Sequence, residues 1–429
     1  MLHNDAPARS ALNEHDAHLH AHRAEATRRH VYFFYRGASK LHGSSASSAP
    51  GIPVVPLFQE YLLIEPRFRW CLDLTGSIAS WLETLRQPDR PGQVKFCREG
   101  NLLEPSQRAG LGASCLALKI AYQIGHWDRL DGVVQQTWVD HVRSFQSPTT
   151  GLFEDPVLLS LTARTTFRNI WKPLSRQSRV DIIRAESRQA AAALLAVENP
   201  PLFPFNDIPD NPRSVRDYLD QLPWYLNPWH SASQTSHLVF FWKMNCEFFA
   251  GQERFRELFN SVMKYLDYLQ DHTSGAWFGN SRLPRAVPLS QRVNAAMKVL
   301  TIYRLLNQPV PRADRLIDLC LAAIGNRDAC HSVDVIFALH ECCRWTNHRR
   351  AEIESKADAM LMRIRDHARA DGAFSFSAGR AGTSYYGARV SRGLPESDVH
   401  GTHLLVWAVT LCADLLGFKT ELGWRLPVT

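Results

Sequence analysis

Residues Tyr265–Trp277, which read YLDYLQDHTSGAW, decide the fold that the sequence predicts. This stretch contains a helix end, a short polar loop, and a glycine followed two residues later by an aromatic residue. The same order recurs in HVRSFQSPTTGLF (141–153) and in IRDHARADGAF (364–374). Glycine can adopt a positive φ at a helix C-terminus, which lets the aromatic side chain fold back onto the helix that it follows. We therefore expect a repeat of helical hairpins.

The hairpins are expected to form one closed domain. In two of the three copies, a glutamine precedes the glycine by five residues (Gln146 and Gln270), where its amide can satisfy backbone groups of the loop or helix end. Apolar residues recur at three- and four-residue steps almost throughout residues 53–429, and strand-like alternation is scarce. Hairpins that cannot bury their apolar faces alone must stack or close on themselves. The sequence predicts an all-α protein, an (α/α)6-type toroid over residues 53–429.

The spacing Tyr265-Leu266-x3-Gln270-x4-Gly275-x-Trp277 resembles the QW repeat of the terpenoid cyclases and protein prenyltransferase β subunits, and residues 141–153 hold a weaker copy. The resemblance covers roughly residues 110–417. It implies inner helices around a cavity, outer helices antiparallel to them, and an enzyme that acts on an isoprenoid-type substrate. Six-hairpin glycosidases and several polysaccharide lyases have similar toroids without the glutamine.

Residues 1–52 are predicted to be a flexible, His-rich extension, since seven of the 18 histidines lie between His3 and His42. The net charge of +7 is spread over 429 residues without a Lys/Arg block, so nucleic acid is not expected as a partner. The sequence contains no apolar run long enough for a membrane span and no secretory signal. Nine cysteines scattered through apolar stretches favour reduced thiols and a cytoplasmic location.

Candidate site residues gather at the predicted starts of the inner helices. These starts lie near Ala113, Ile183, Ser233, Ser290, Cys330 and Val399. Several helix N-termini at one mouth favour negative charge, and a partly desolvated acid or base there would have a shifted pKa. The candidate catalytic residues are Glu186, His331, Asp334, Asp398 and His400. The candidate substrate-binding residues are Arg188, His237, Arg292, Asn294, Trp229, Trp277, Tyr385 and Tyr386. A capping role is the structural alternative, above all for Asp398.

One pair in this set is suited to acid–base work, because His331 and Asp334 lie one turn apart on the same helix. That pair identifies no particular reaction. The Asp-x-Asp-Asp cluster of class II terpenoid cyclases and the Asp-rich Mg²⁺ motif of class I synthases are both missing from the sequence.

The prenyltransferase resemblance also implies one zinc ion. Asp-x-Cys at the start of one inner helix and a histidine at the start of the next would supply Asp328, Cys330 and His400 as ligands, a set that suits zinc. The sequence departs from the family pattern because His331 replaces an aromatic residue and Gly401 separates His400 from Thr402. The position of the histidine therefore differs from the family pattern, and Cys330 can equally be a buried thiol.

A carbohydrate substrate is the main alternative, because aromatic rings stack on sugars as readily as they line an isoprenoid pocket. A polysaccharide lyase would use Tyr or His as base and acid, with Arg or Asn neutralising a uronate carboxylate. A glycoside hydrolase would need two carboxyl groups about 5 to 9 Å apart. In either case a small molecule or a glycan occupies the cavity. A non-catalytic α-solenoid that binds proteins is the second alternative, and it predicts an open array of helices.

Overall fold

A computed structural model describes residues 68–103, 110–168, 178–249, 253–278, 287–323 and 328–427, with no account of the side chains of 163–168, 253 and 254. The predicted flexible extension (1–52) and the predicted domain boundary lie outside these residues. The helices described below all belong to the unit Glu60–Thr429. None of them is long and apolar enough to cross a membrane.

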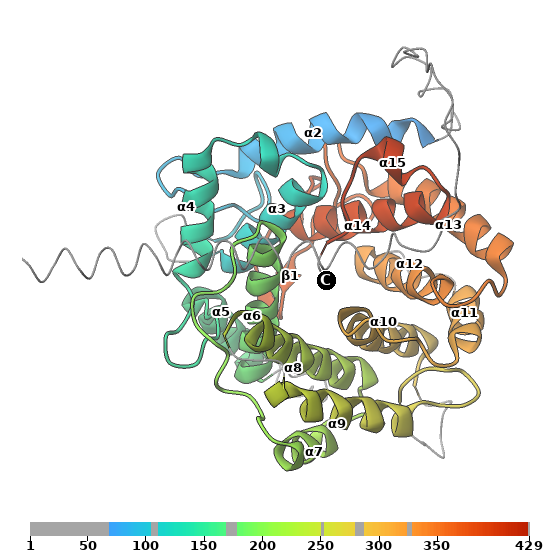
Figure 1. Ribbon diagram of the computed structural model, residues 1–429. Helices are drawn as coiled ribbons and strands as arrows, with labels where there is room; N and C mark the ends of the chain where they lie inside the picture. The colour runs from blue at the N-terminus through green and yellow to red at the C-terminus, as the bar shows by residue number, and fades with distance from the viewer. Residues whose placement is uncertain are drawn as a thin grey trace, which may run out of the picture. The chain divides into compact units, whose positions relative to one another are not determined.

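Six inner helices form a closed ring (Figure 1). They are α3 (Leu111–Gln123), α6 (Arg179–Ala196), α8 (Pro228–Phe248), α10 (Leu289–Leu305), α12 (Ala329–Cys343) and α14 (Val399–Leu415). Each packs on the next in that order, and α14 packs on α3 to complete the ring. The predicted starts fall within the first two turns of these helices. The all-α toroid is thus confirmed, and the closed ring excludes the open solenoid.

Outer helices return the chain between the inner ones, so the N-terminal ends of the inner helices share one rim. The outer helices are α2 (Trp70–Leu85), α4 (Gly132–Arg143), α5 (Pro156–Arg168), α7 (Pro212–Gln221), α9 (Glu253–Leu269), α11 (Ala313–Ala322) and α13 (Arg350–Ile364). Three short helices complete the described set: η3 (Trp127–Arg129), η6 (Arg365–His367) and α15 (Lys419–Leu422). The two strands β1 (Ser384–Tyr385) and β2 (Ala388–Arg389) form one antiparallel hairpin.

Burial separates inner from outer helices. Every residue of α3 is buried, whereas α4 buries only Trp138, Val139 and Val142. A helix covered on all sides is apolar around its circumference, and a surface helix buries one stripe. Polar residues inside α3 therefore need a specific partner or a specific purpose, because burying them unpaired is costly.

The Gly-aromatic loops have the predicted conformation. Gly151, Gly275 and Gly372 all have positive φ, at 73°, 72° and 103°. The Gln270 amide donates to the carbonyl oxygens of Gly275 (2.8 Å) and Pro311 (2.9 Å). The Gln146 amide likewise donates to Gly151 O (2.9 Å) and to a carbonyl 57 residues further along. The glutamine therefore ties each loop to the segment before a later outer helix, α11 for Gln270 and α7 for Gln146.

Candidate active site

Polar side chains from the inner helices line the inside of the ring. The half-buried members of this lining are Arg188 and Gln189 on α6, Ser233 on α8, Asn294 and Lys298 on α10, Cys330 on α12, and His400 on α14. Most of the positions around them on the same helices are fully buried. Their remaining exposure indicates that they face an accessible space at the centre of the ring.

The charge of Lys298 on α10 acts on side chains of four other inner helices, so these side chains lie within range of one charge. Burial raises the pKa of Asp334 on α12 to about 7, and the positive charge of Lys298 opposes this rise. Burial lowers the pKa of His400 on α14 to about 4, and Lys298 adds to that effect. Burial also lowers the pKa of His237 on α8 well below its usual 6.5, with Lys298 among the contributing charges. Finally, burial together with Arg188 and Lys298 lowers the pKa of Lys119 on α3 to about 7.

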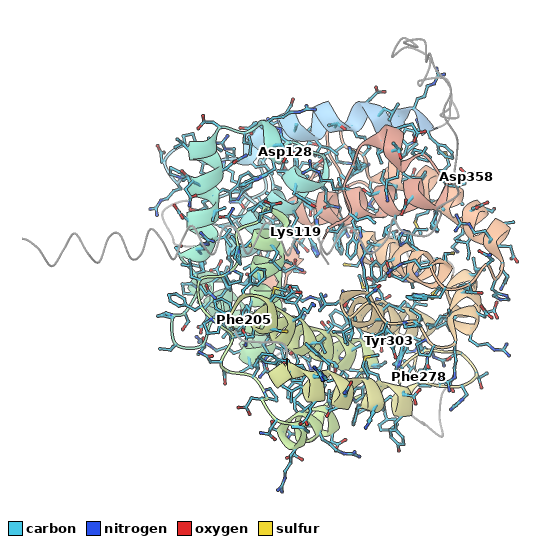
Figure 2. The ribbon with its side chains drawn as sticks, in the orientation of Figure 1. Lys119, Asp128, Phe205, Phe278, Tyr303 and Asp358 are labelled. Carbon is cyan, nitrogen blue, oxygen red and sulfur yellow. The ribbon has the colours of Figure 1, made fainter. Side chains whose placement is uncertain are left out.

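Two cations of this cavity have neutral partners. The Arg188 guanidinium donates to the Ser236 hydroxyl (2.5 Å) and to the Thr301 hydroxyl (3.2 Å). The Lys119 ammonium donates to the side-chain oxygen of Gln189 (2.5 Å). Figure 2 shows Lys119 on the side of α3 that faces the centre of the ring. These bonds fix the position of the positive charge without neutralising it.

The hairpin β1–β2 places two tyrosines at the rim of the ring. Its turn is formed by Tyr386 and Gly387, which have φ values of 44° and 80°. Glycine adopts such a conformation freely, but a bulky residue does so only at a cost and usually for a functional reason. The ring of Tyr385 lies against His400 (5.6 Å between centroids), and a side chain at position 112 on α3 would collide with it. Gly112 is therefore required for the hairpin to reach the cavity.

Glu186 lies at the seam between α3 and α6, beside the Tyr385 hydroxyl. It is 2% exposed, and neither its carboxylate oxygens nor the Tyr385 hydroxyl makes a regular hydrogen bond within the described residues. Burial raises the pKa of Glu186 to about 8, the charge of Asp155 adds to the rise, and the interaction with Tyr385 opposes it. Glu186 is thus a neutral acid at neutral pH. Burial and the neighbouring Glu186 raise the pKa of Tyr385 well above its usual 10.

Asp155, next to this acid, has a structural role. Its carboxylate accepts hydrogen bonds from the backbone amides of Gly110 (2.9 Å) and Leu111 (3.2 Å) at the start of α3, and from those of Val157 (3.0 Å) and Leu158 (3.1 Å) at the start of α5. One carboxylate therefore caps two helices. It also lines a cavity of about 10 Å³ together with Glu186 and Tyr385.

Asp334 lies across the ring from Glu186, because α12 is the third helix from α6 in both directions. The Asn294 amide, with its nitrogen directed toward α12, donates to Asp334 (3.3 Å) and to Ser290 O (2.8 Å). Asp334 is 4% exposed. The structure therefore brings together a carboxyl, an amide and the Lys298 ammonium on this side of the cavity.

Aromatic side chains close the ring further along the inner helices. Phe337, one turn after Asp334 on α12, packs against Trp407 of α14 with 5.3 Å between ring centroids. The guanidinium of Arg304 lies over Phe337 (5.7 Å) and pairs with the buried Glu341 (2.7 Å). Phe337 is fully buried, so these rings belong to the packed core of the ring.

No protein-family model matches this chain, and no curated protein matches it. Among solved structures, the chain is similar to a possible member of the GH105 family from Salmonella enterica subsp. enterica serovar Paratyphi A. The similarity covers 86% of this chain and 100% of that chain, at 12% identity and a TM-score of 0.41. A similarity this distant assigns no activity to the chain.

Asp398 and Asp328, predicted as a catalytic residue and a metal ligand, are helix caps. Asp398 is fully buried and accepts hydrogen bonds from the backbone amides of Gly401 (2.8 Å), Phe376 (2.8 Å) and Gly382 (2.9 Å). Asp328 accepts from the backbone amide of the third residue of α12 (2.8 Å). The capping role that the sequence left open for Asp398 is therefore present in the structure.

The predicted His331–Asp334 pair is not formed. The two side chains share no hydrogen bond, and the Nδ1 atom of His331 has no partner among the described residues. Burial lowers the pKa of His331, and the charges that act on it include Arg363 and Lys356 of the outer helix α13. His331 therefore lies within range of charges from the outer layer.

The predicted zinc ligands do not form a cluster. Within the ranges that the structure describes, no three His, Cys, Asp or Glu side chains are arranged to hold a metal ion. The carboxylate of Asp328 is engaged as a cap, and the His400 ring stacks on Phe376 (5.0 Å). Burial and the charges of Asp334 and Asp328 raise the pKa of Cys330, which disfavours the thiolate that zinc requires.

Three predicted substrate-binding residues lie away from the cavity centre. Trp277 is fully buried and packs on Tyr303 of α10 (5.7 Å), so it joins an outer helix to an inner one. Arg292 lies over the ring of Phe278 (5.1 Å) and donates to the Val287 carbonyl (3.0 Å). Trp229 is 36% exposed in the first turn of α8, at the rim of the ring.

Three residues of the cavity were missed in the sequence: Lys119, Gln189 and Lys298. Lys119 is the only charged residue of α3, and Lys298 interrupts the apolar run AAMKVLTIY. A charge inside a helix that is otherwise apolar is expensive to bury. A lysine inside an otherwise apolar helix is therefore a sequence signal for a functional residue, and this signal identifies both Lys119 and Lys298.

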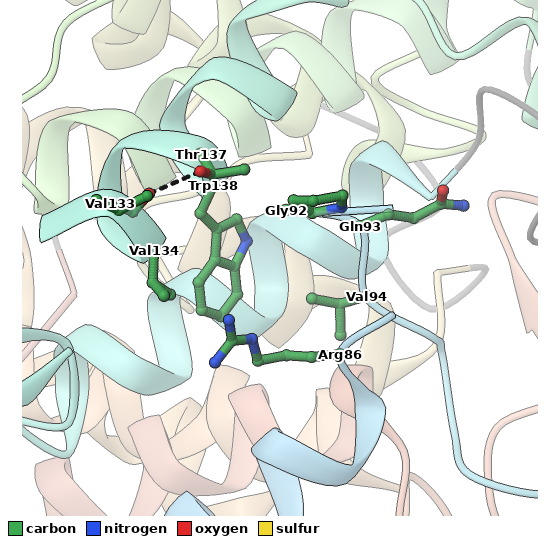
Figure 3. Close-up of a pocket in the computed structure, with 9 residues that line it drawn as sticks. Arg86, Gly92, Gln93, Val94, Val133, Val134, Thr137 and Trp138 are labelled. Atoms are coloured by element: carbon green, nitrogen blue, oxygen red, sulfur yellow. Dashed lines mark hydrogen bonds between the residues drawn. The ribbon is translucent and has the colours of Figure 1, made fainter. Parts of the chain in front are cut away.

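A separate cavity of about 220 Å³ lies outside the ring, between α4 and the segment that follows α2 (Figure 3). Arg86, Val94, Val134 and Trp138 are among its lining residues. None of the predicted site residues borders it. We therefore place the candidate site inside the ring and not in this outer cavity.

Proposed function

We propose that this chain is a carbohydrate-active hydrolase that cleaves a glycosidic bond inside the ring. The observation that carries the proposal is the presence of two buried carboxyl groups with raised pKa values, Glu186 (about 8) and Asp334 (about 7), on opposite inner helices of a polar ring. Two carboxyl groups on either side of a sugar are the usual apparatus of glycoside hydrolysis.

The polar lining favours a sugar over an isoprenoid chain. An isoprenoid would cover ammonium, guanidinium, amide and imidazole groups without offering them hydrogen bonds, and that desolvation would not be compensated. Sugar hydroxyls can bond to such groups and so compensate that desolvation. We therefore favour the carbohydrate alternative over the terpenoid cyclase or prenyltransferase prediction.

The same electrostatics favour hydrolysis over the lyase reaction. A lyase needs a base for the proton next to the carboxylate, but the pKa of Tyr385 is raised well above 10. His400, with a pKa of about 4, is a weak base. Glu186, in contrast, carries a proton at neutral pH and is suited to donating it to a leaving group.

In the proposed reaction, the glycosidic oxygen takes a proton from Glu186 through the Tyr385 hydroxyl, which gives up its own proton and receives that of the carboxyl. Ionised Asp334, held by Asn294 and Lys298, accepts a proton from the water that attacks the anomeric carbon. The bond to the leaving sugar breaks as the bond to water forms. Because Asp334 activates a water in this reaction and does not itself attack the sugar, we expect inversion at the anomeric carbon.

The test is hydrolysis of a panel of oligosaccharides by the full chain and its variants. Glu186→Gln, Tyr385→Phe and Asp334→Asn should each lower kcat by about 10²–10⁴-fold, the usual contribution of a proton-transfer group. The exposed Glu257→Gln on α9 is the control and should keep full activity. Oxygen from isotopically labelled water should enter the product. An unsaturated product without labelled oxygen would establish a lyase instead, and turnover of an isoprenyl diphosphate would refute the carbohydrate assignment.

A further inference from the structure

Three cations from three inner helices share the inside of the ring. They are Lys119 on α3, Arg188 on α6 and Lys298 on α10, and none of them forms an ion pair within the described part of the chain. As described above, Arg188 and Lys119 have hydroxyl and amide partners, which carry no charge. Among the described carboxyl groups whose pKa is perturbed, Lys298 acts on Asp334. Burial raises the pKa of Asp334 to about 7, so part of this carboxyl is neutral at neutral pH.

Hydrogen bonds place these three cations near one another: Lys119 bonds to Gln189, the residue after Arg188 on α6, and Arg188 bonds to Thr301, which lies one turn after Lys298 on α10. Arg188 and Lys298 both add to the lowered pKa of Lys119, and both add to the lowered pKa of His237. The Nδ1 atom of His237 also has no hydrogen-bond partner among the described residues, and this side chain is 6% exposed. A protein rarely holds like charges together in a partly buried space unless a ligand offsets them.

The donors are arranged for one compact anion. The Arg188 guanidinium is fixed by Ser236 and Thr301, and the Lys119 ammonium by Gln189, so little side-chain entropy remains to be lost on binding. Arginine and lysine donors together bind oxyanions by charge-assisted hydrogen bonds. Lys298 and Arg188 are both half-buried, so the group is accessible from the ring interior.

We propose that Lys119, Arg188 and Lys298 form an oxyanion-binding subsite that selects sugars carrying a negatively charged substituent. The assignment of the ligand as a sugar rests on the proposed function, whereas the assignment of an oxyanion rests on the three cations alone. The shared chemistry is a carboxylate, sulfate ester or phosphate ester on the sugar. The subsite lies beside the Glu186–Tyr385 acid, because Gln189, the partner of Lys119, follows Glu186 on α6 by one turn.

The experiment measures binding of four probes to the full chain by titration calorimetry: glucose, glucuronate, glucose 6-sulfate and glucose 6-phosphate. We expect at least one charged sugar to bind about tenfold or more tightly than glucose, and added salt to weaken it. Comparison of the three charged probes identifies the substituent. Equal affinity for glucose and all charged sugars would overturn the proposal without reference to any variant.

Variants then locate the subsite. Lys298→Met and Lys119→Met should each weaken binding of the charged sugar by about tenfold more than they weaken binding of glucose. Lys264→Met, an exposed lysine on the outer helix α9, is the matched control. If the charged sugar binds the two cavity variants as well as it binds the wild type, the subsite is elsewhere and the inference fails.

The two proposals fail in different ways. Binding of the charged sugar without any glycoside hydrolysis supports the oxyanion subsite and counts against the hydrolase. Hydrolysis of neutral glycans with no preference for charged sugars supports the hydrolase and overturns the subsite. Tight binding of inorganic pyrophosphate above all four sugars overturns the sugar assignment.

Discussion

The stability of the Glu186→Gln variant relative to the wild type should increase as the pH rises. The folded state holds the Glu186 pKa at about 8, against an ordinary value of 4.5. Between these values the carboxyl is protonated when folded and ionised when unfolded, so the folded state loses about 1.4 kcal/mol of stability for each pH unit. Relative to acid pH, that loss is at most about 3 kcal/mol at pH 7 and about 5 kcal/mol at pH 8 and above. Glutamine resembles the protonated acid and does not ionise.

The assay is urea unfolding of the wild type and Glu186→Gln at about pH 5, 6, 7 and 8, with the difference in unfolding free energy plotted against pH. That difference should grow in favour of the variant from acid to alkaline pH, on top of any constant offset from the amide itself. The contributions of Asp334 and the histidines cancel because both proteins contain them. Glu257→Gln should show no trend. A flat difference, or one that favours the wild type more at higher pH, would refute the assignment of Glu186 as a buried, protonated acid.

Three further predictions concern the framework. Gly151→Ala and Gly125→Ala both place a side chain at positive φ (73° and 71°). The new side chain would collide with backbone at Gly151, whereas nothing lies within 4 Å at Gly125. Urea unfolding should show a loss of stability of about 1 kcal/mol for Gly125→Ala and clearly more for Gly151→Ala, and equal losses would contradict the loop assignment. Arg304→Met removes a partner of the buried Glu341, and should lower the unfolding free energy by about 3 kcal/mol at neutral pH. Because partners hold the Glu341 pKa at about 2, this deficit should shrink as the pH falls below 4.5 toward 2; a deficit independent of pH would argue against the ion pair. Asp398→Ala removes three backbone hydrogen bonds and should cost about 2 kcal/mol or more, seen as a lower calorimetric Tm; an unchanged Tm with lost activity would return Asp398 to the catalytic set.

The fold could be predicted because its signals are local. A glycine that follows a helix and precedes an aromatic residue by two positions predicts the conformation of a single turn. Gly151, Gly275 and Gly372 all have the positive φ that this turn requires. Three- and four-residue apolar spacing likewise needs no knowledge of distant residues. The closure of the ring followed from the need of each hairpin to bury its inner face, and α14 against α3 satisfies that need.

The site was harder to predict because its signals are ambiguous or distant. An aspartate at a helix start serves equally well as a cap or as a catalytic acid, and only the three amides around Asp398 decide between them. The neighbours of Glu186 include Tyr385, about 200 residues away, whose place depends on the absence of a side chain at Gly112. Lys119 and Lys298 lie within apolar stretches, and the sequence alone does not show which side of the helix either lysine faces. The two lysines can be recognised as site residues only from the packing of α3, α6 and α10 around one space.

Burial has opposite effects on the two groups that meet at the seam of α3 and α6, and both effects prepare the cavity for an anion. It raises the pKa of Glu186 to about 8 and lowers that of Lys119 to about 7, so each group moves toward its uncharged form near neutral pH. An oxyanion bound to Lys119 would favour the protonated lysine and, by repulsion, would also oppose ionisation of Glu186. The bound anion thus favours the charged form of Lys119, which binds it, and the protonated form of Glu186, which donates the proton in the proposed reaction. For an anionic sugar, kcat/KM should therefore rise as Asp334 ionises through about pH 7 and fall as Glu186 ionises through about pH 8. Lys119→Met should lower it by the larger factor toward lower pH, where the lysine is charged.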